Sequence, residues 1–337
     1  MLHIHNGDAS ANIAKQSSLP GEHFAFREAL IDGPIPAEVK DVNAFKLIRA
    51  RHLSDAYGVD PKQGLRDLTA QEAKLASFRE HDEVVLWFEY DLFCQIHLIY
   101  LLDWYGRQQL EHTRLSLICI GEFSGKENFR GLGELTAEEL ASLFPRRQQV
   151  TQAQLDLATA AWQAYCSADP TDIEKFLQTD TLALPFLEAS LRAHLRRFPS
   201  NKNGLGRIED RALELIYQGH HRFTDLFPKF AEAEPVYGLG DAQLWAAIRR
   251  MIAAESPLLM VAGLENERPD RQTLTPEIVS KAGFKLTELG HAVLRDEADF
   301  VFLAHIDYWL GGVHLKGSRD LWRWAEQAET VFLSRPH

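Results

Sequence analysis

The sequence predicts an α/β protein, in which helices alternate with the strands of a mainly parallel sheet. Two segments, Val84–Phe88 and Leu115–Ile120, are almost continuously apolar, as expected for strands that are covered on both faces. The helical pattern of Leu92–Trp104 separates them, and parallel strands need a crossover connection of this kind. We therefore expect a Rossmann-like sheet with helices on both faces.

The rest of the first 135 residues follows the same alternation. Strands are expected at Leu2–His5 and Glu22–Phe26, and helices at Ala9–Gln16, Ala44–Tyr57 and Thr69–Arg79. The last of these helices is expected to begin at a capping box, because Glu72 follows Thr69 by three residues.

The middle of the chain is helical in pattern throughout. Helices are expected at Thr136–Leu143, Thr151–Tyr165, Thr171–Leu177 and Leu184–Arg197. Pro199–Gly204 is the best candidate for a linker, because it is polar and rich in turn-forming residues. The sequence thus predicts a Rossmann-like domain over 1–135, a helical segment over 136–198 packed on it, and a third domain over 204–337.

The third domain has the order of elements found in winged helices. Three short helices come first, at Arg207–Tyr217, Phe223–Ala231 and Asp241–Ala254. A strand at Leu258–Val261, a polar loop at Glu265–Arg271 and a second strand at Phe284–Leu286 follow, before a helix that starts at Thr287. We therefore expect a winged-helix-like α+β domain.

Composition limits the classes of function. With 337 residues, 45% apolar and 25% charged, the chain is typical of a globular protein with two or three domains. The net charge of −12 argues against broad electrostatic binding to nucleic acid or to an anionic membrane. The N-terminus lacks the pattern of a signal peptide, and no apolar run approaches the ~20 residues of a membrane span.

The three cysteines are odd in number and include no C-x-x-C pair. Reduced, buried thiols of a cytoplasmic protein are the favoured interpretation, and a catalytic thiol or metal ligand is the alternative.

The turn Asn6-Gly7-Asp8-Ala9-Ser10 follows the first predicted strand and opens the first helix. The N-terminus of a helix attracts phosphate, and Gly7 would let a ligand approach the backbone closely. The motif is weak, because Asp8 would repel a phosphate unless it caps the helix or holds a metal ion. A capping role alone is the alternative.

Glu89 and Asp91 end the strand Val84–Phe88, at the edge where open α/β sheets bind ligands. They alternate with Tyr90 and so point the same way, which suits binding of Mg²⁺, a hydrogen bond to a ribose, or acid–base chemistry. Gln95, one helical turn beyond Asp91, would face the same crevice. Alternatively, Asp91 only caps the next helix and Glu89 is exposed.

Charged residues after other predicted elements could complete this site. Arg27 and Glu122 follow strands and would reach the same edge, and Arg49 and Arg51 could pair with an anionic ligand. A solvated surface position is the alternative for each of them.

Histidines give weaker signals. His3 and His5 share one face of the first strand, a spacing found in metal sites, but buried or capping histidines are the favoured interpretation. His314, beside a glycine turn, is also expected to be structural.

DNA binding would use the helix Asp241–Ala254, whose outward residues are Asp241, Gln243, Arg249 and Arg250. Residues 201–337 contain 16 Lys and Arg against 20 Asp and Glu, a net charge of −4. A DNA reader usually concentrates positive charge, so a protein-contact or scaffold role is favoured for this domain.

Several motifs resemble known bacterial families. LHIHNGD, DGPIP, IRARHL and VVLWFEYDLFCQIHLIYLLDWY resemble the family called domain of unknown function 1835, over residues 1–125. LGDAQLW, LTELGHAVL and IDYWLGGVHL are similar to its companion, domain of unknown function 3658, over about 235–320, and GLGELTAEELASLFPRRQQVT resembles the connection between the two. The resemblance implies no activity and transfers no catalytic residue.

The sequence therefore predicts a cytoplasmic protein that binds a nucleotide or another phosphorylated small molecule at the carboxyl edge of its sheet. Asp8, Glu89 and Asp91 would be the acidic or metal-facing groups, with Arg27 and Arg49 on the anion. Asn6, Gly7, Ser10, Gln95 and Glu122 would contact the ligand. Mg²⁺ is a candidate cofactor, and hydrolase or transferase activity is an open extension. The alternative function is a ligand-sensing regulator whose last domain contacts DNA or a protein partner.

Overall fold

A five-stranded, mainly parallel sheet organises the first half of the protein. The computed structural model describes residues 1–39, 41–262 and 283–335. The strands are β1 (Leu2–Asn6), β2 (Glu22–Phe26), β3 (Glu83–Glu89), β4 (Arg114–Ile120) and β5 (Gln148–Gln149). They lie in the order β2-β1-β3-β4-β5, and all pairs are parallel except β4 with β5. The prediction of an α/β protein with a mainly parallel sheet is confirmed.

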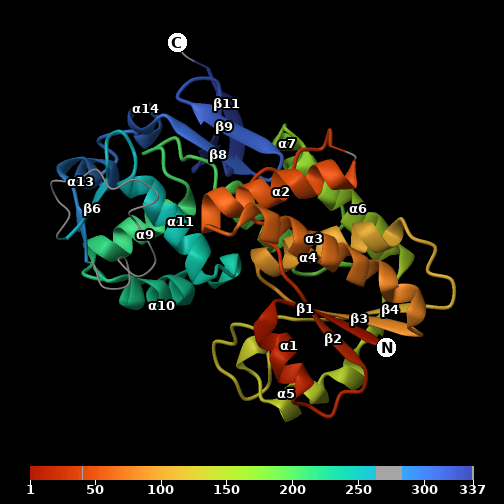
Figure 1. The fold of residues 1–337 in the computed structure, drawn as a ribbon. Coiled ribbons are helices and arrows are strands. Elements are labelled where there is room, and N and C mark those ends of the chain that lie inside the picture. Colours follow the sequence, from red (N-terminus) through yellow and green to blue (C-terminus); the bar gives the residue numbers. More distant parts are fainter. Residues whose placement is uncertain (40, 263–282, 336–337) are drawn as a thin grey trace.

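Both faces of the sheet are covered by helices. Leu86 and Phe88 of β3 point into the main core, while Val85 and Trp87 point into a smaller core on the opposite face. This alternation is why β3 is apolar at nearly every position. The helices α1 (Asp8–Lys15) and α5 (Ala137–Ser142) lie on the side of the smaller core, and α4 (Leu92–Gly106) lies on the other side (Figure 1).

Local signals explain where several helices begin. Asp91 caps α4, since its side chain accepts a hydrogen bond from the Cys94 N–H. Thr136 and Thr151 form capping boxes at the starts of α5 and α6 (Gln152–Cys166). Apolar residues surround α4 on all sides, which suits its position between the sheet, α6 and α8 (Leu187–Leu195).

The start predicted at Thr69 is wrong. This residue lies inside α3 (Pro61–Ala76), where its hydroxyl donates to the carbonyl of Leu65. The helix begins eight residues earlier, because Asp60 caps it and Pro61 occupies its first position. The preceding helix, α2, spans Val42–Tyr57.

The predicted linker Pro199–Gly204 is packed into the protein. Pro199 and Ser200 are buried, and the backbone N–H of Asn201 donates to the carbonyl of Trp324. One large core runs from Leu2 in β1 to Val331 near the C-terminus and includes all three predicted domains. The boundaries between those domains stay a prediction.

The C-terminal part contains small antiparallel sheets. The helices described in this part are α9 (Arg207–Tyr217), α10 (Phe223–Ala233), α11 (Asp241–Ile252), α13 (Glu288–Leu294) and α14 (Phe300–Ala304). As predicted, β6 (Leu259–Val261) pairs with β7 (Phe284–Leu286). The predicted loop Glu265–Arg271 lies outside the described residues. Two hairpins were not predicted, β8 (Ile306–Leu310) with β9 (Val313–Gly317) and β10 (Leu321–Ala325) with β11 (Thr330–Ser334).

The remaining described elements are short. They are α7 (Thr171–Phe176) and the 3₁₀ turns η1 (Ser77–Glu80), η2 (Leu132–Glu134), η3 (Phe144–Arg146) and η4 (Pro235–Tyr237). In the part of the chain that the structure describes, no helix combines the length and the apolar character needed to cross a membrane.

Candidate functional site

The order of the strands marks one place on the carboxyl edge of the sheet. From β1 the chain crosses to β2 on one side, whereas β3 lies on the other side of β1. The loops after β1 and β3 therefore lead in opposite directions, and open α/β sheets bind ligands in the crevice that this leaves. Asn6 ends β1 and Glu89 ends β3, so both predicted loops meet at this point.

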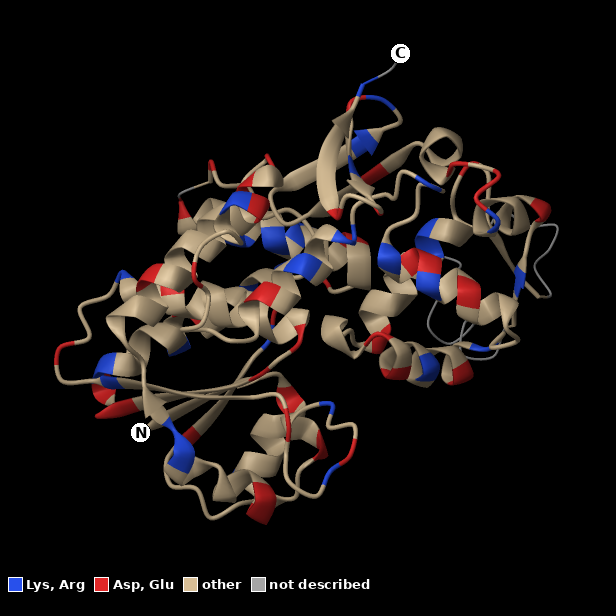
Figure 2. Cartoon of the chain, turned by 180° about the vertical axis from the view of Figure 1, so that it is seen from behind, with Lys and Arg blue, Asp and Glu red and all other residues tan. Residues whose placement is uncertain are grey.

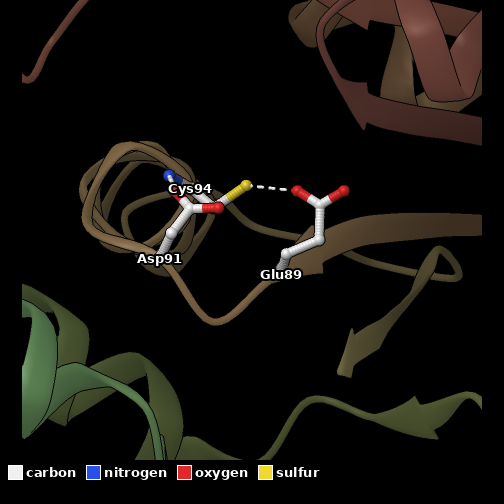
Figure 3. Close-up of side chains that lie close together, drawn as sticks. All are labelled: Glu89, Asp91 and Cys94. Carbon is white, nitrogen blue, oxygen red and sulfur yellow. Dashed lines mark hydrogen bonds between the residues drawn. The ribbon is translucent and has the colours of Figure 1, made fainter. Parts of the chain in front are cut away.

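Glu89, Asp91 and Cys94 form a compact buried group there (Figure 3). The possible ligand atoms of the three side chains all lie within 4.8 Å of one another. The Cys94 thiol points at Glu89 and lies 2.5 Å from its Oε2, and Asp91 Oδ1 accepts from the Cys94 N–H at 2.8 Å. Within the described residues this is the one group of three side chains placed to hold a metal ion.

The two carboxyl groups are difficult to ionise. Burial, together with the charge of Asp91, raises the pKa of Glu89 from its ordinary value to about 7. Burial raises the pKa of Asp91 to about 6. Burial also raises the pKa of the Cys94 thiol, and the two neighbouring carboxylates raise it further. The group therefore favours bound protons, or another positive charge, at neutral pH.

In the part of the chain that the structure describes, no cationic side chain pairs with Glu89 or Asp91. Among the ion pairs that the described residues form, none includes Glu89 or Asp91, although other buried acids such as Glu28 and Glu83 have arginine partners. Glu89 accepts instead from neutral donors, the Leu132 N–H at 2.6 Å and the Cys94 thiol. Two adjacent buried carboxylates without a cation are costly unless a proton or a metal ion neutralises them.

A chain of hydrogen bonds connects this group with the end of β1. The Leu30 N–H donates to His97 Nε2, so the ring carries its proton on Nδ1 and donates to Asn6 Oδ1 at 2.6 Å. Asn6 Nδ2 then donates to the Cys94 sulfur at 2.7 Å. Burial lowers the pKa of His97 to about 3, which keeps its ring neutral. Asn6 therefore reaches the site through Cys94.

Gln95 and Cys119 lie beside the same strand end. Gln95 is buried and donates to the carbonyl of Glu89 at 2.6 Å, and its side chain also contacts the sulfur of Cys119. The sequence correctly placed Gln95 on the side of Glu89, but its amide is used to fix the backbone.

Two glycines that were not predicted to belong to the site cover the carboxylates. Gly131 has a φ of +152°, and a Cβ there would lie 2.9 Å from Glu89 Oε1. Gly238, at a φ of +60°, lies so close to Asp91 that a Cβ would overlap its carboxylate. Each stands in a Gly-Leu-Gly sequence, which was the one local signal, since glycine easily adopts the positive φ angles found here.

The turn Gly7–Asp8 at the start of α1 lies open beside this group. Gly7 has a φ of +89°, no side chain caps the helix, and a Cβ on Gly7 would meet nothing within 4 Å. Asp8 does not join Glu89 and Asp91. Its exposed carboxylate pairs with Arg27 at 2.5 Å, and this ion pair lowers the pKa of Asp8.

Other predicted ligand residues are not brought to the site. The guanidinium of Arg49 is fully buried and donates to Glu28 and to the carbonyls of Ala29 and Asp32, so it has no face toward an anion. Glu122 is exposed, as is Arg51, and the side chain of Ser10 is buried within α1. Arg27 and Arg49 are therefore engaged in two separate ion pairs, with Asp8 and with Glu28. Neither arginine joins Glu89 and Asp91 in a single site.

His3 and His5 point into the smaller core, as favoured by the sequence. His5 contacts His23 at 3.2 Å, and His3 accepts from the indole N–H of Trp87 at 3.0 Å. Burial lowers the pKa of His3 to about 4 and that of His5 to about 2. His314 forms a hydrogen bond with Asp307, and its ring stacks on that of Trp309. Both contacts agree with the structural role expected for this histidine.

Comparison with protein-family models gives no match for this chain, and neither does a search of the curated proteins. The resemblance to the two bacterial families of unknown function stays a prediction. A function for the site has to be argued from its geometry.

Proposed function

We propose that this protein binds a nucleotide or another phosphorylated small molecule through a divalent cation that Glu89 and Asp91 hold. The observation that carries the proposal is the pair itself: two buried carboxylates at the carboxyl end of a central parallel strand, neither of which has a cationic partner among the described residues. Burial raises the pKa of both carboxyl groups, and the charge of Asp91 raises that of Glu89 further, so a bound cation would stabilise the ionised pair.

The donor set favours a cation that prefers oxygen. Carboxylate and phosphate oxygens are the usual ligands of Mg²⁺ and Mn²⁺. The sulfur of Cys94 is already engaged, because it accepts from Asn6 and its proton points at Glu89. A phosphate group would complete the coordination of the cation.

The start of α1 offers a second contact for the phosphate. Its first N–H groups have no side-chain cap, and they lie beside Asn6, which is linked to Glu89 through Cys94. The same arrangement suits hydrolysis or transfer of the phosphoryl group, because the cation would neutralise charge as the bond to phosphorus breaks.

The fold and the cellular location predicted from the sequence are compatible with this proposed function. We infer that the sheet is Rossmann-like, because its parallel strands have the order of a doubly wound fold. We also infer a winged-helix-like arrangement for α9, α10, α11 and the β6–β7 pair. The three unpaired cysteines agree with the predicted cytoplasmic location.

The proposal is tested by calorimetric titration of Mn²⁺, and by thermal shift with Mg²⁺ and nucleoside triphosphates. We expect Mn²⁺ to bind the wild type, and Mg²⁺ with a nucleotide to raise stability by about 2.7 kcal/mol at a hundredfold excess over Kd. Glu89→Gln and Asp91→Asn should abolish both effects, and asparagine keeps the cap on α4. Glu122→Gln, which removes an exposed acid from the same edge, is the matched control.

Absence of Mn²⁺ binding to the wild type would refute the cation site. Equal binding to Glu89→Gln, Asp91→Asn and the control would refute the assignment of its ligands.

The alternative, a regulator that reads DNA with α11, receives no support from the contacts of this helix. Arg249 donates to the carbonyl of Ala56 in α2, and Arg250 pairs with Glu209. Figure 2 shows acidic and basic residues interspersed over the C-terminal helices that the structure describes, and these helices carry no continuous basic stripe of the kind found in a DNA reader. A duplex-binding assay at low salt with Arg249→Ala and Arg250→Ala would reveal such binding.

A further inference from the structure

A cavity of about 700 Å³ lies between α2, α11 and the β8–β9 hairpin. Figure 1 shows these elements gathered in one region, although they come from distant parts of the sequence. The cavity is lined by none of Glu89, Asp91 and Cys94, so it is separate from the carboxylate pair. Its volume is in the range of about 300–1,000 Å³ that small-molecule sites occupy.

Buried ion pairs hold the walls of the cavity in place. Asp32 contacts Arg197 at 2.5 Å and accepts from the hydroxyl of Tyr57 at 2.7 Å, which joins the loop before α2 to α2 itself and to the segment that follows α8. Arg250 of α11 pairs with Glu209 of α9. These contacts connect the segments that form the walls, which limits the ordering needed on binding.

Unused hydrogen-bond donors face into this space. The guanidinium of Arg250 lies over the ring of Tyr308, with its carbon 5.0 Å from the ring centroid, and only its Nη2 donates to Glu209. About a third of the Arg250 side chain is exposed, at 32%. The hydroxyl of Tyr308 forms no hydrogen bond with any described residue, and Tyr308 is half-buried in the cavity wall.

The acids in the wall do not oppose an anion, because each has a positive partner. Asp32 pairs with Arg197, Glu209 with Arg250, and Asp307 with Lys316. The fourth acid, Asp55, lies 3.9 Å from the exposed Arg51 at the rim. The lining also contains polar side chains, among them His52, His305 and His314. Its apolar part includes several small residues, which leave room for an organic body: Ile48, Ala56, Ala246, Ala253, Ala254 and Phe300.

We propose that this cavity binds a small organic anion, whose acidic group accepts hydrogen bonds from Arg250 and Tyr308 and whose ring or hydrocarbon part packs on the alanines. A carboxylate and a phosphate monoester share this chemistry. The cavity would thus be a second ligand site, independent of the divalent-cation site at the sheet edge.

The test uses isothermal titration with three probes on the full chain. Adenosine 5′-monophosphate represents a ring-bearing phosphate, indole-3-acetate a ring-bearing carboxylate, and adenosine is the neutral counterpart. All titrations are made in chelator without divalent cations. We expect at least one acidic probe to bind and adenosine to bind at least tenfold more weakly, because a hydrogen bond to a charged group contributes this much.

Two variants locate the binding. Tyr308→Phe removes only the unpaired hydroxyl and should weaken the acidic probe about tenfold or more. Ala254→Leu should weaken it similarly by filling the cavity, without any change at Arg250. Tyr217→Phe, at an exposed tyrosine outside the cavity, should bind as the wild type does, and thermal unfolding of each variant checks that the fold is kept.

Failure of both acidic probes to bind would overturn the proposal, as would binding that neither Tyr308→Phe nor Ala254→Leu weakens. The two sites are distinguishable, because Glu89→Gln and Asp91→Asn should leave the binding of the acidic probe unchanged. Loss of the probe in those two variants would place it at the sheet edge and also overturn the proposal.

Discussion

Single buried charged residues in this protein fall into two kinds. Arg49 is fully buried, but Glu28 and two backbone carbonyls satisfy its guanidinium, so it stabilises the fold and offers nothing to a ligand. Glu89 and Asp91 are equally buried without any such partner among the described residues. The difference in partners, and not burial itself, separates the candidate site from the structural ion pairs.

The raised pKa values predict how stability depends on pH. A carboxyl group whose pKa is higher in the folded state contributes full stability below its unfolded pKa and loses it as the pH rises through its folded pKa. For Glu89 and Asp91 this window extends from about pH 4 to about pH 7. In chelator, Glu89→Gln should therefore gain stability relative to the wild type as the pH rises across this window, by on the order of 1–3 kcal/mol.

Urea unfolding of both proteins at several pH values measures this gain. The comparison between variant and wild type is needed, because the buried His3 and His5 act in the opposite direction and destabilise the folded state as the pH falls. A difference that stays constant with pH would contradict the raised pKa values, and Glu122→Gln is the control.

At the scale of single elements, caps decided several boundaries. Thr136 and Thr151 have the pattern of a capping box and form one. Thr69 has the same pattern, with Glu72 three residues later, but its neighbours on both sides are helical and its hydroxyl bonds back to Leu65. Asp60 followed by Pro61 was the stronger start signal.

This contrast predicts the effects of two alanine substitutions. Asp60→Ala should lower the free energy of unfolding by about 1 kcal/mol, because the N–H of Gln63 loses its cap. Thr69→Ala should change the free energy of unfolding by less than about 0.5 kcal/mol. Thr69 is exposed inside the helix, and the higher helix propensity of alanine offsets the loss of the hydroxyl bond to Leu65. Thermal and urea unfolding of both variants measure these changes. A loss of stability larger for Thr69→Ala than for Asp60→Ala would mean that the helix starts at Thr69.

The site depends on the whole molecule, because distant segments enclose the end of β3. Gly131, in the loop after β4, covers Glu89, and Gly238, in the turn before α11, covers Asp91. The C-terminal half, through Gly238, therefore contacts the carboxyl edge of the N-terminal sheet. This contact helps to enclose the two carboxylates.

Gly238→Ala tests this contact. A methyl group there would overlap the Asp91 carboxylate, so Asp91 would have to leave its capping position on α4. Gly58→Ala is the matched control, because Gly58 has a similar φ of +74° but open space around its Cβ position. Each variant should lose about 1 kcal/mol from backbone strain, and Gly238→Ala about 1–2 kcal/mol more from the lost cap, measured by urea unfolding. Equal losses would show that Gly238 does not press on Asp91.

Much of the fold could be predicted from local patterns. The apolar runs of β3 and β4 and the helix between them were sufficient to expect a parallel sheet covered on both faces, since burial of both faces leaves a visible mark on the sequence. The hairpins β8–β9 and β10–β11 were missed, because a glycine turn and mixed polarity do not distinguish a hairpin from a loop. Arg49 was misjudged because nothing near it in sequence shows that Glu28 lies against it.

By itself, the sequence determined the class of the fold and the position of Glu89 and Asp91 at a strand end, because both follow from residues that are neighbours along the chain. Only the tertiary structure decided that these acids are enclosed without a cationic partner among the described residues, while Asp8 and Arg27 stay exposed. It also decided that three distant elements form a cavity lined by Arg250 and Tyr308. The physical reason is that burial and charge pairing arise between segments far apart in sequence, where no local pattern records them.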